Sequence, residues 1–308
     1  MAGINWDAFI NTNRIGIGLG LGLSQLLPPV IGYRVAELIA RLVASRKNSK
    51  LVQSARLNQW IVRGGNLTEK ELNQAVLSVL MSTARGLYDY FHYYNRPEKM
   101  KEMMRFSPYF SKIFNDRMKY ERGMLFVAPH LGSFDLAGAC LSTRGLKFQV
   151  LSYPRPSDSY KLQNKMRDRL GIHMTPFTME ALQEARKRLQ EGGTVLTGLD
   201  RPWEESSYRP KFFGRSAVLP VAYVQLAMRV GVPVVVVATY QTPDGFYCLD
   251  CTEPVTMVTS NDREKDILHN AELLLSLAEK FIRQYKDQWA MFYPVWPDAL
   301  SEIKPLKG

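Results

Sequence analysis

Histidine and cysteine are scarce in this sequence. Its 308 residues include four histidines and three cysteines. Cys248 and Cys251 have the spacing of a redox or zinc motif, yet no second cysteine pair follows to complete a zinc tetrahedron. We expect no metal and no cofactor, and three unorganised thiols are typical of a reducing, cytosolic setting.

Several familiar catalytic motifs are absent as well. No Gly-x-Ser-x-Gly elbow is present, which argues against a serine hydrolase. There is also no Walker loop and no dinucleotide fingerprint. The alternating glycines from Gly16 to Gly22 imitate a phosphate-binding loop, but they follow no strand and no phosphate-binding lysine accompanies them.

Acidic residues are scarce in the first part of the chain. Residues 1–125 hold 18 Lys and Arg against 9 Asp and Glu, and six bases without an acid lie between Glu37 and Glu69. An anionic membrane surface is the favoured partner of this run, because an apolar stretch lies directly before it. A merely solvated face, an acidic carrier protein and the phosphates of coenzyme A stay open. Nucleic acid is not expected, since no groove-reading motif accompanies the charge.

The apolar stretch itself runs from Ile15 to Tyr33 and carries no charge over 19 residues. That is close to the ~20 residues that cross a bilayer. Five glycines and Pro28-Pro29 weaken it as one spanning helix, so we expect a helix or broken helix in the membrane interface, continued by an amphipathic helix over Val35–Val43. A single-pass span and a buried hairpin of a soluble protein are the alternatives.

Strands and helices alternate from Met124 onward. Apolar runs predict strands at Met124–Ala128, Lys147–Ser152, Thr194–Leu199, Val232–Tyr240 and Phe246–Cys251. Helices are predicted at Asp135–Ser142, Tyr160–Leu170, Met179–Gln190, Ala217–Arg229 and Arg263–Gln288. This alternation indicates an α/β fold with a mainly parallel central sheet flanked by helices. We divide the chain into an N-terminal arm (1–50) and a main domain (51–308), with a helical lead-in over 67–120 and an α/β core over 123–300.

One histidine stands where a predicted strand passes into a predicted helix. His130 follows the strand Met124–Ala128, and Asp135 lies five positions further on. Ligands of open α/β sheets bind at the carboxyl ends of strands. An imidazole there can accept a proton from a hydroxyl, while a nearby carboxylate orients the ring. The other histidines are expected in a loop or in structural or solvated positions: His173, His92 and His269.

The residues around this histidine resemble a known family. The ordered set is His130-x4-Asp135, Tyr153-Pro-Arg155-Pro, Arg167-Asp-Arg-Leu-Gly171, Gly198-Leu-Asp200-Arg201-Pro, Phe212-Phe-Gly214 and Leu219-Pro220. Over roughly residues 10–300 this order is similar to the bacterial late acyltransferases of lipid A biosynthesis and the related phosphatidylinositol mannoside acyltransferases. The lipid A branch usually has Glu where this chain has Asp135, and the mannoside branch has Asp, which leaves the acceptor open.

The resemblance implies a glycerolipid-acyltransferase-like fold and a membrane-associated O-acyltransferase. An acyl-CoA or acyl carrier protein would donate a fatty chain to a hydroxyl of a glycolipid, phospholipid or lipid A-type acceptor, at the cytoplasmic face of the bacterial inner membrane. In this reading His130 is the general base and Asp135 its partner. The expected substrate-binding residues are Arg155, Arg167, Asp200 and Arg201, and the expected lining of an acyl channel is Phe212, Phe213, Gly214 and Pro220.

Two other functions remain open from the sequence. An acyltransferase for lysophospholipid or glycerol phosphate shares His-x4-Asp, but it usually carries a Glu-Gly-Thr-Arg block that the stretch Glu191-Gly-Gly-Thr194 does not match. A non-catalytic lipid-binding protein on the same fold is the other alternative, and the presence of both His130 and Asp135 argues against it.

Overall fold

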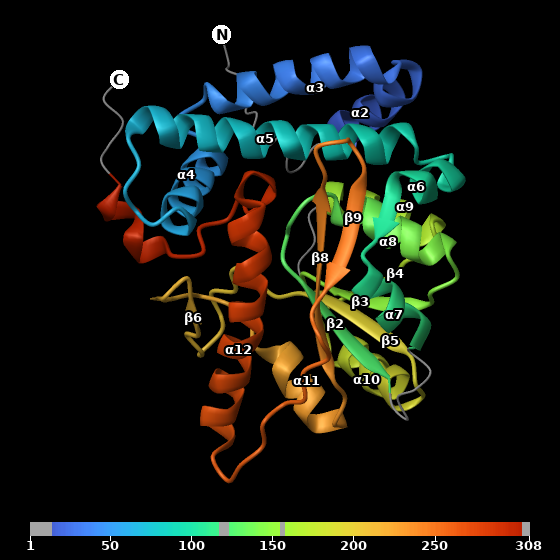
Figure 1. Ribbon diagram of the computed structural model, residues 1–308, viewed down its shortest axis with the longest axis vertical. Helices are drawn as coiled ribbons and strands as arrows, with labels where there is room; N and C mark the ends of the chain where they lie inside the picture. Colours follow the sequence, from blue (N-terminus) through green and yellow to red (C-terminus); the bar gives the residue numbers. More distant parts are fainter. Residues whose placement is uncertain (1–13, 117–122, 155–157, 304–308) are drawn as a thin grey trace.

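The computed structural model describes residues 14–116, 123–154 and 158–303 (Figure 1). The helices that precede β2 in the chain are α2 (Arg14–Leu26), α3 (Pro29–Ala44), α4 (Lys50–Val62), α5 (Glu69–His92), α6 (Pro97–Met103) and α7 (Pro108–Asp116). The later helices are α8 (Phe134–Thr143), α9 (Asp158–Arg169), α10 (Met179–Gln190), α11 (Ala222–Val230) and α12 (Arg263–Gln284), followed by two short 3-10 helices, η2 (Lys286–Gln288) and η3 (Pro297–Glu302).

Seven strands form one sheet in the order β1-β9-β8-β2-β5-β3-β4. They are β1 (Met104–Phe106), β2 (Met124–Ala128), β3 (Phe148–Ser152), β4 (His173–Pro176), β5 (Thr194–Gly198), β8 (Val234–Gln241) and β9 (Tyr247–Cys251). All neighbouring pairs are parallel except β8 and β9. The predicted α/β fold with a mainly parallel sheet is therefore confirmed. A small hairpin of β6 (Lys211–Phe212) and β7 (Arg215–Ser216) lies outside this sheet.

Two edge strands were not predicted. β4 includes His173, which the sequence placed in a loop, and this prediction is wrong. The strand is short and only partly buried, so it lacks the apolar run that marks the central strands. β1 is three residues long and pairs with β9, and its sequence Met-Arg-Phe likewise carries too little pattern to be recognised.

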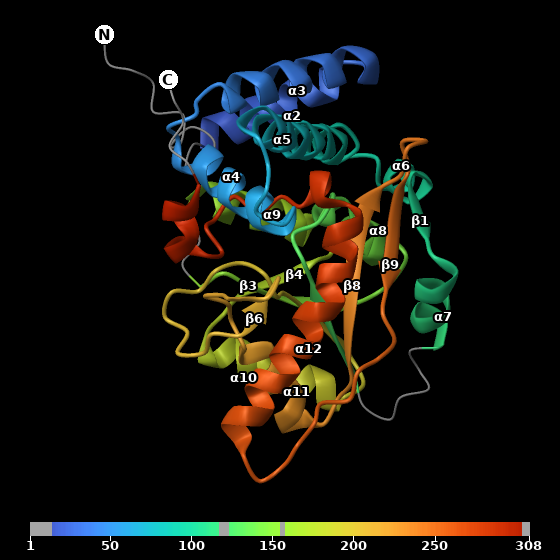
Figure 2. The same cartoon turned by 60° about the vertical axis from the view of Figure 1, so that its left-hand side comes forward.

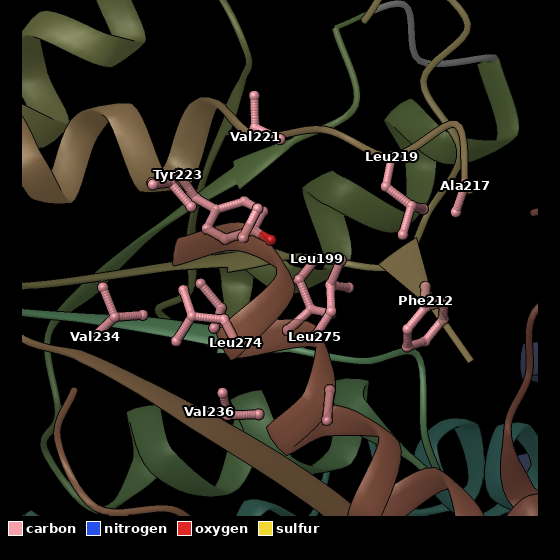
Figure 3. Close-up of a cluster of buried hydrophobic side chains, with 14 of the residues drawn as sticks. Leu199, Phe212, Ala217, Leu219, Val221, Tyr223, Val234, Val236, Leu274 and Leu275 are labelled. Atoms are coloured by element: carbon pink, nitrogen blue, oxygen red, sulfur yellow. The ribbon is translucent and has the colours of Figure 1, made fainter. Parts of the chain in front are cut away.

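Helices cover both faces of the sheet and form two separate cores. On one face α10, α11 and α12 pack against alternate strand residues such as Leu125 and Val195. On the other face α7 and α8 pack against the intervening residues, such as Phe126 and Leu196. Figure 3 shows part of the first core, where Leu274 and Leu275 of α12 lie beside β8. The period of two along each strand separates the two sets of side chains.

The N-terminal helices lie together at one end of the molecule, and α3 packs along α5 (Figures 1 and 2). α5 begins at a capping box in which the Thr68 side chain accepts from the backbone N–H of Glu71. Gly32 allows the close approach of α3, because a Cβ there would lie 2.0 Å from the Tyr88 ring. The stretch from Ile15 to Tyr33 is divided between α2 and α3, and none of the helices in the described ranges has the length and apolar character needed to cross a bilayer.

Candidate active site

Two strand ends bring a histidine and an aspartate together. His130 follows β2 and Asp200 follows β5, and these strands are neighbours with Ala128 opposite Gly198. Asp200 is expected from the sequence among the substrate-binding residues, and the structure places its carboxylate against the His130 imidazole. A Cβ at Gly198 would lie only 3.1 Å from His130 Cε1, so the glycine lets the imidazole rest against β5.

Asp200 holds both the ring and the backbone of His130. His130 Nδ1 lies 2.6 Å from Asp200 Oδ1, and the backbone N–H of His130 donates to Oδ2 at 2.8 Å. Trp289 Nε1 donates to the same Oδ2 at 2.7 Å. Asp200 is completely buried, whereas the His130 side chain is 26% exposed. Because an ionised carboxylate only accepts hydrogen bonds, Nδ1 carries the proton and the free lone pair lies on Nε2.

The segment after α12 fixes the loop that carries this histidine. Gly132 N–H donates to the carbonyl of Gln288 at 2.9 Å, and Ala290 N–H donates to the carbonyl of His130 at 2.8 Å. Gly132 has a φ of 59°, and a Cβ there would lie 2.3 Å from a backbone carbonyl oxygen, so this position requires glycine. Sequence reasoning missed Trp289, because an indole 89 positions from Asp200 leaves no local signal of their contact.

Asp135 has a different partner from the one that the sequence predicted. Arg167 Nε donates to Oδ1 at 2.7 Å and Arg167 Nη2 donates to Oδ2 at 3.1 Å, which makes a bidentate pair. Arg167 Nη1 donates to Asn164 Oδ1 at 2.8 Å. The predicted contact between His130 and Asp135 is therefore corrected. Asp200 is the carboxylate on the imidazole because β5 delivers it directly beside β2, while Asp135 in the first turn of α8 faces α9.

The ion pair between Asp135 and Arg167 is largely buried, with side-chain exposures of 16% and 6%. Burial by itself lowers the pKa of the Arg167 guanidinium, but the charge and hydrogen bonds of Asp135 outweigh burial, and the pKa is raised. Burial, and then the charge of Asp135, raise the pKa of the nearby Tyr90 phenol. Arg167 is thus held as a cation against Asp135, and its predicted part in substrate binding stays a prediction.

We expect Arg167→Leu to destabilise the protein by about 3–5 kcal/mol, because it leaves the Asp135 carboxylate buried without its counter-charge. Urea unfolding followed by circular dichroism measures this loss. The double variant Arg167→Leu with Asp135→Asn removes both charges and should recover much of the stability. A single variant as stable as the wild type would contradict the structural part assigned to this pair.

A cavity opens beside His130 and extends between the sheet and α8. Its apolar walls include Phe126, Val150 and Leu196 from the strands and Phe134, Ala137 and Leu141 from α8. The Phe134 ring lies edge-on to the His130 imidazole with centroids 5.3 Å apart. A hydrocarbon chain is the kind of group that such walls can bind, and the imidazole stands where the polar end of that group would lie.

Aromatic side chains and an arginine line another part of the same cavity. Arg201 lies between two rings, with its guanidinium carbon 4.2 Å from the Tyr153 centroid and 4.4 Å from the Tyr293 centroid. The Trp203 and Phe177 rings make a T-shaped contact with their centroids 5.3 Å apart. Arg201, Tyr153 and Trp203 all line the cavity, so its wall combines a cation with flat apolar faces.

The loop that the sequence assigned to an acyl channel is divided. Pro220 lines the cavity, as predicted. Phe212 belongs instead to the core (Figure 3). It is fully buried and stacked on Trp296 with ring centroids 5.5 Å apart. The Phe212 ring also contacts Trp289, with ring centroids 6.1 Å apart. Phe212 therefore helps to hold the indole that donates to Asp200. Arg155 lies outside the described residues.

Comparison with known proteins agrees with the family suggested by the motifs. Residues 10–297 match the family described as bacterial lipid A biosynthesis acyltransferase. A phosphatidylinositol mannoside acyltransferase from Mycolicibacterium smegmatis is 26% identical over 191 residues, which cover 59% of this chain and 59% of that protein. The resemblance inferred from the sequence is confirmed. The chain belongs to the bacterial lipid A biosynthesis acyltransferase family.

Proposed function

We propose that this protein is a membrane-associated O-acyltransferase that moves a fatty acyl chain from an acyl thioester to a hydroxyl group of a glycolipid or lipid A-type acceptor. The observation that carries the proposal is a buried carboxylate, Asp200, which orients His130 beside an apolar cavity. Family membership supports the class of reaction, and the similarity to a phosphatidylinositol mannoside acyltransferase supports a glycolipid acceptor.

The chemistry needs one proton acceptor and no covalent enzyme intermediate. His130 Nε2 takes the proton of the acceptor hydroxyl as its oxygen attacks the thioester carbonyl carbon. Asp200 stabilises the imidazolium that forms, through the bond to Nδ1. The tetrahedral intermediate then breaks its C–S bond, and the leaving thiolate takes the proton from the imidazolium. The products are an ester and a free thiol, and His130 returns to its starting state.

The two parts of the cavity suit the two ends of a thioester donor. The apolar part between the sheet and α8 would hold the acyl chain. Arg201, flanked by Tyr153 and Tyr293, would bind a phosphate, either of the phosphopantetheine arm that coenzyme A and acyl carrier protein share or of the acceptor lipid.

The test is acyl transfer by the full chain with several donors and acceptors. Acyl-CoA and acyl carrier protein thioesters are each offered with a phosphatidylinositol mannoside, a lipid A precursor, a lysophospholipid and glycerol phosphate, and products are identified by mass spectrometry. We expect an acylated glycolipid. Transfer only to lysophospholipid or glycerol phosphate would overturn the acceptor class, and thioester binding without any transfer would indicate a lipid-binding protein.

The outer face of α3 supports membrane association. Its side chains toward α5 are small and buried, at Gly32, Ala36 and Ala40. Its opposite face exposes a set of large apolar side chains, namely Val30, Ile31, Leu38, Ile39 and Leu42. Arg34 and Arg41 are exposed on the same helix. A contiguous apolar face with cations beside it matches a helix that lies in the headgroup region of an anionic bilayer.

The same helix lies close to the site. α5 carries α3 on one side, and Gly86 of α5 touches the loop after His130, because a Cβ at Gly86 would lie 3.3 Å from Ser133 Cβ. A bilayer against α3 would therefore be separated from this loop by one helix. We propose that this arrangement delivers lipid substrates from the cytoplasmic face of the membrane.

Leu38→Glu with Leu42→Glu should weaken binding to anionic vesicles by about tenfold or more, because both side chains, 57% exposed in the free protein, would otherwise be buried in lipid. Sedimentation with vesicles of mixed phosphatidylglycerol and phosphatidylcholine measures the partition, with salt as a second variable. Met179→Glu is the matched control, since Met179 is 65% exposed on α10 at the other end of the molecule (Figure 1). Equal losses in both variants would contradict a membrane role for α3.

A further inference from the structure

The cavity beside His130 extends along β3, away from the catalytic edge of the sheet. Ser152 and Phe148, the last and first residues of β3, both line it. The four residue-to-residue steps between them span about 13 Å. Phe148 is level with Thr194 in β5, which in turn is level with Met124, the first residue of β2. Neither Thr194 nor Met124 lines the cavity, so it extends from the catalytic edge of the sheet as far as the Phe148 side chain.

One face of α8 forms the opposite wall over the same distance. Phe134, Ala137, Gly138 and Leu141 line the cavity, and their spacing of three and four residues places them on one side of the helix. Phe134, the first residue of α8, contacts the His130 imidazole. Leu141 lies about 10 Å further along the helix axis. The wall that α8 provides thus runs from the His130 imidazole to Leu141.

A glycine stands in this wall between Phe134 and Leu141. A Cβ built on Gly138 would lie 3.1 Å from Ile172 Cδ1 and 4.0 Å from Phe148 Cζ, two side chains that also line the cavity. Gly138 is partly exposed although its neighbours Ala137 and Ala139 are buried. Glycine is the poorest helix former apart from proline, so its presence inside α8 requires a reason. The reason visible here is space between the helix backbone and Ile172.

We propose that Gly138 determines how long an acyl chain the cavity accepts. The chain would pass over the bare backbone at Gly138 and end against Leu141 and Phe148. The part of the cavity lined by Phe110 and Leu249 is the competing place for the end of the chain. The inference rests on the proposed function in one respect, that the cavity holds the acyl chain of the donor.

The test measures binding as a function of chain length, without requiring transfer. Thioethers of phosphopantetheine with alkyl chains from hexyl to hexadecyl are titrated into the full chain by calorimetry. In the wild type, affinity should rise with each added methylene until the chain reaches the end of the cavity. In Gly138→Ala the rise should stop roughly three to four methylenes earlier, which corresponds to the helix length between residues 138 and 141.

A second substitution should restore the original limit. Ile172→Val removes Cδ1, the atom that a Cβ at residue 138 would meet at 3.1 Å. The double variant Gly138→Ala with Ile172→Val should therefore accept chains of wild-type length again. Gly22→Ala is the matched control, because Gly22 is also a helix glycine but has no atom within 4 Å of its Cβ position. Its length limit should be that of the wild type.

Each outcome separates this inference from the proposed function. An unchanged limit in Gly138→Ala overturns the inference and favours the part of the cavity lined by Phe110 and Leu249 as the place for the end of the chain. No recovery in the double variant overturns the inference as well, because the contact with Ile172 would then not set the limit. A shifted limit in a protein that transfers no acyl chain supports the length determinant but overturns the proposed reaction. In an active enzyme, the ratio of product from long and short donors should follow the same order, with a drop of roughly tenfold for Gly138→Ala.

Discussion

His130→Ala is expected to reduce acyl transfer by about 10²–10⁴-fold, the usual loss when a general base is removed. The fold should survive the change. The backbone N–H of His130 still donates to Asp200, and the carbonyl still accepts from Ala290, since neither bond involves the imidazole. Asp200 also keeps the hydrogen bond from Trp289. Steady-state turnover of the variant and the wild type with one acyl thioester measures the loss. Circular dichroism and vesicle sedimentation first check that the variant is folded and binds membranes as the wild type does.

His173→Ala is the matched control for this experiment. His173 also contacts a carboxylate, with Nε2 2.8 Å from Glu184 Oε1, but it lies on the edge strand β4 and is half exposed. Its removal should leave turnover near that of the wild type. Activity of His130→Ala above a tenth of the wild type would overturn the assignment of the base.

The central strands and the position of His130 could be predicted because they depend on local pattern. Met124–Ala128 is a short apolar run, and the strand observed has the same bounds. The polar residues at its end mark the carboxyl edge of the sheet wherever the strand lies in the order. Edge strands such as β4 escaped prediction because partial burial leaves no apolar run to recognise.

The partners of His130 could not be predicted from local pattern alone. Asp135 is close in sequence, but its direction depends on the first turn of α8 and on the arginine that α9 supplies. Asp200 is 70 positions from His130 and reaches it because β2 and β5 pair in register. Trp289 arrives by way of α12 and the 3-10 helix η2 that follows it. Strand order and long-range packing decide these contacts.

Substitutions at the two aspartates separate the two possible partners. Asp135→Asn removes a charge from the pair with Arg167 and leaves that guanidinium buried without its counter-charge. We expect a loss of stability of about 3–5 kcal/mol, with a smaller effect on the turnover of the folded protein than His130→Ala has. Asp135→Glu keeps the charge and should retain some activity.

Asp200→Asn is expected to reduce turnover by about 10²–10⁴-fold, close to the loss in His130→Ala. The amide has the shape of the carboxylate, but it lacks the charge that stabilises the imidazolium. Its NH₂ group can also donate to His130 Nδ1, which moves the ring proton to Nε2 and blocks the atom that must accept the hydroxyl proton. Nitrogen NMR of labelled histidine reports this exchange of tautomer directly, and a purely structural part for Asp200 would not produce it. Wild-type turnover in Asp200→Asn, together with a large turnover loss in folded Asp135→Asn, would instead make Asp135 the partner of the base.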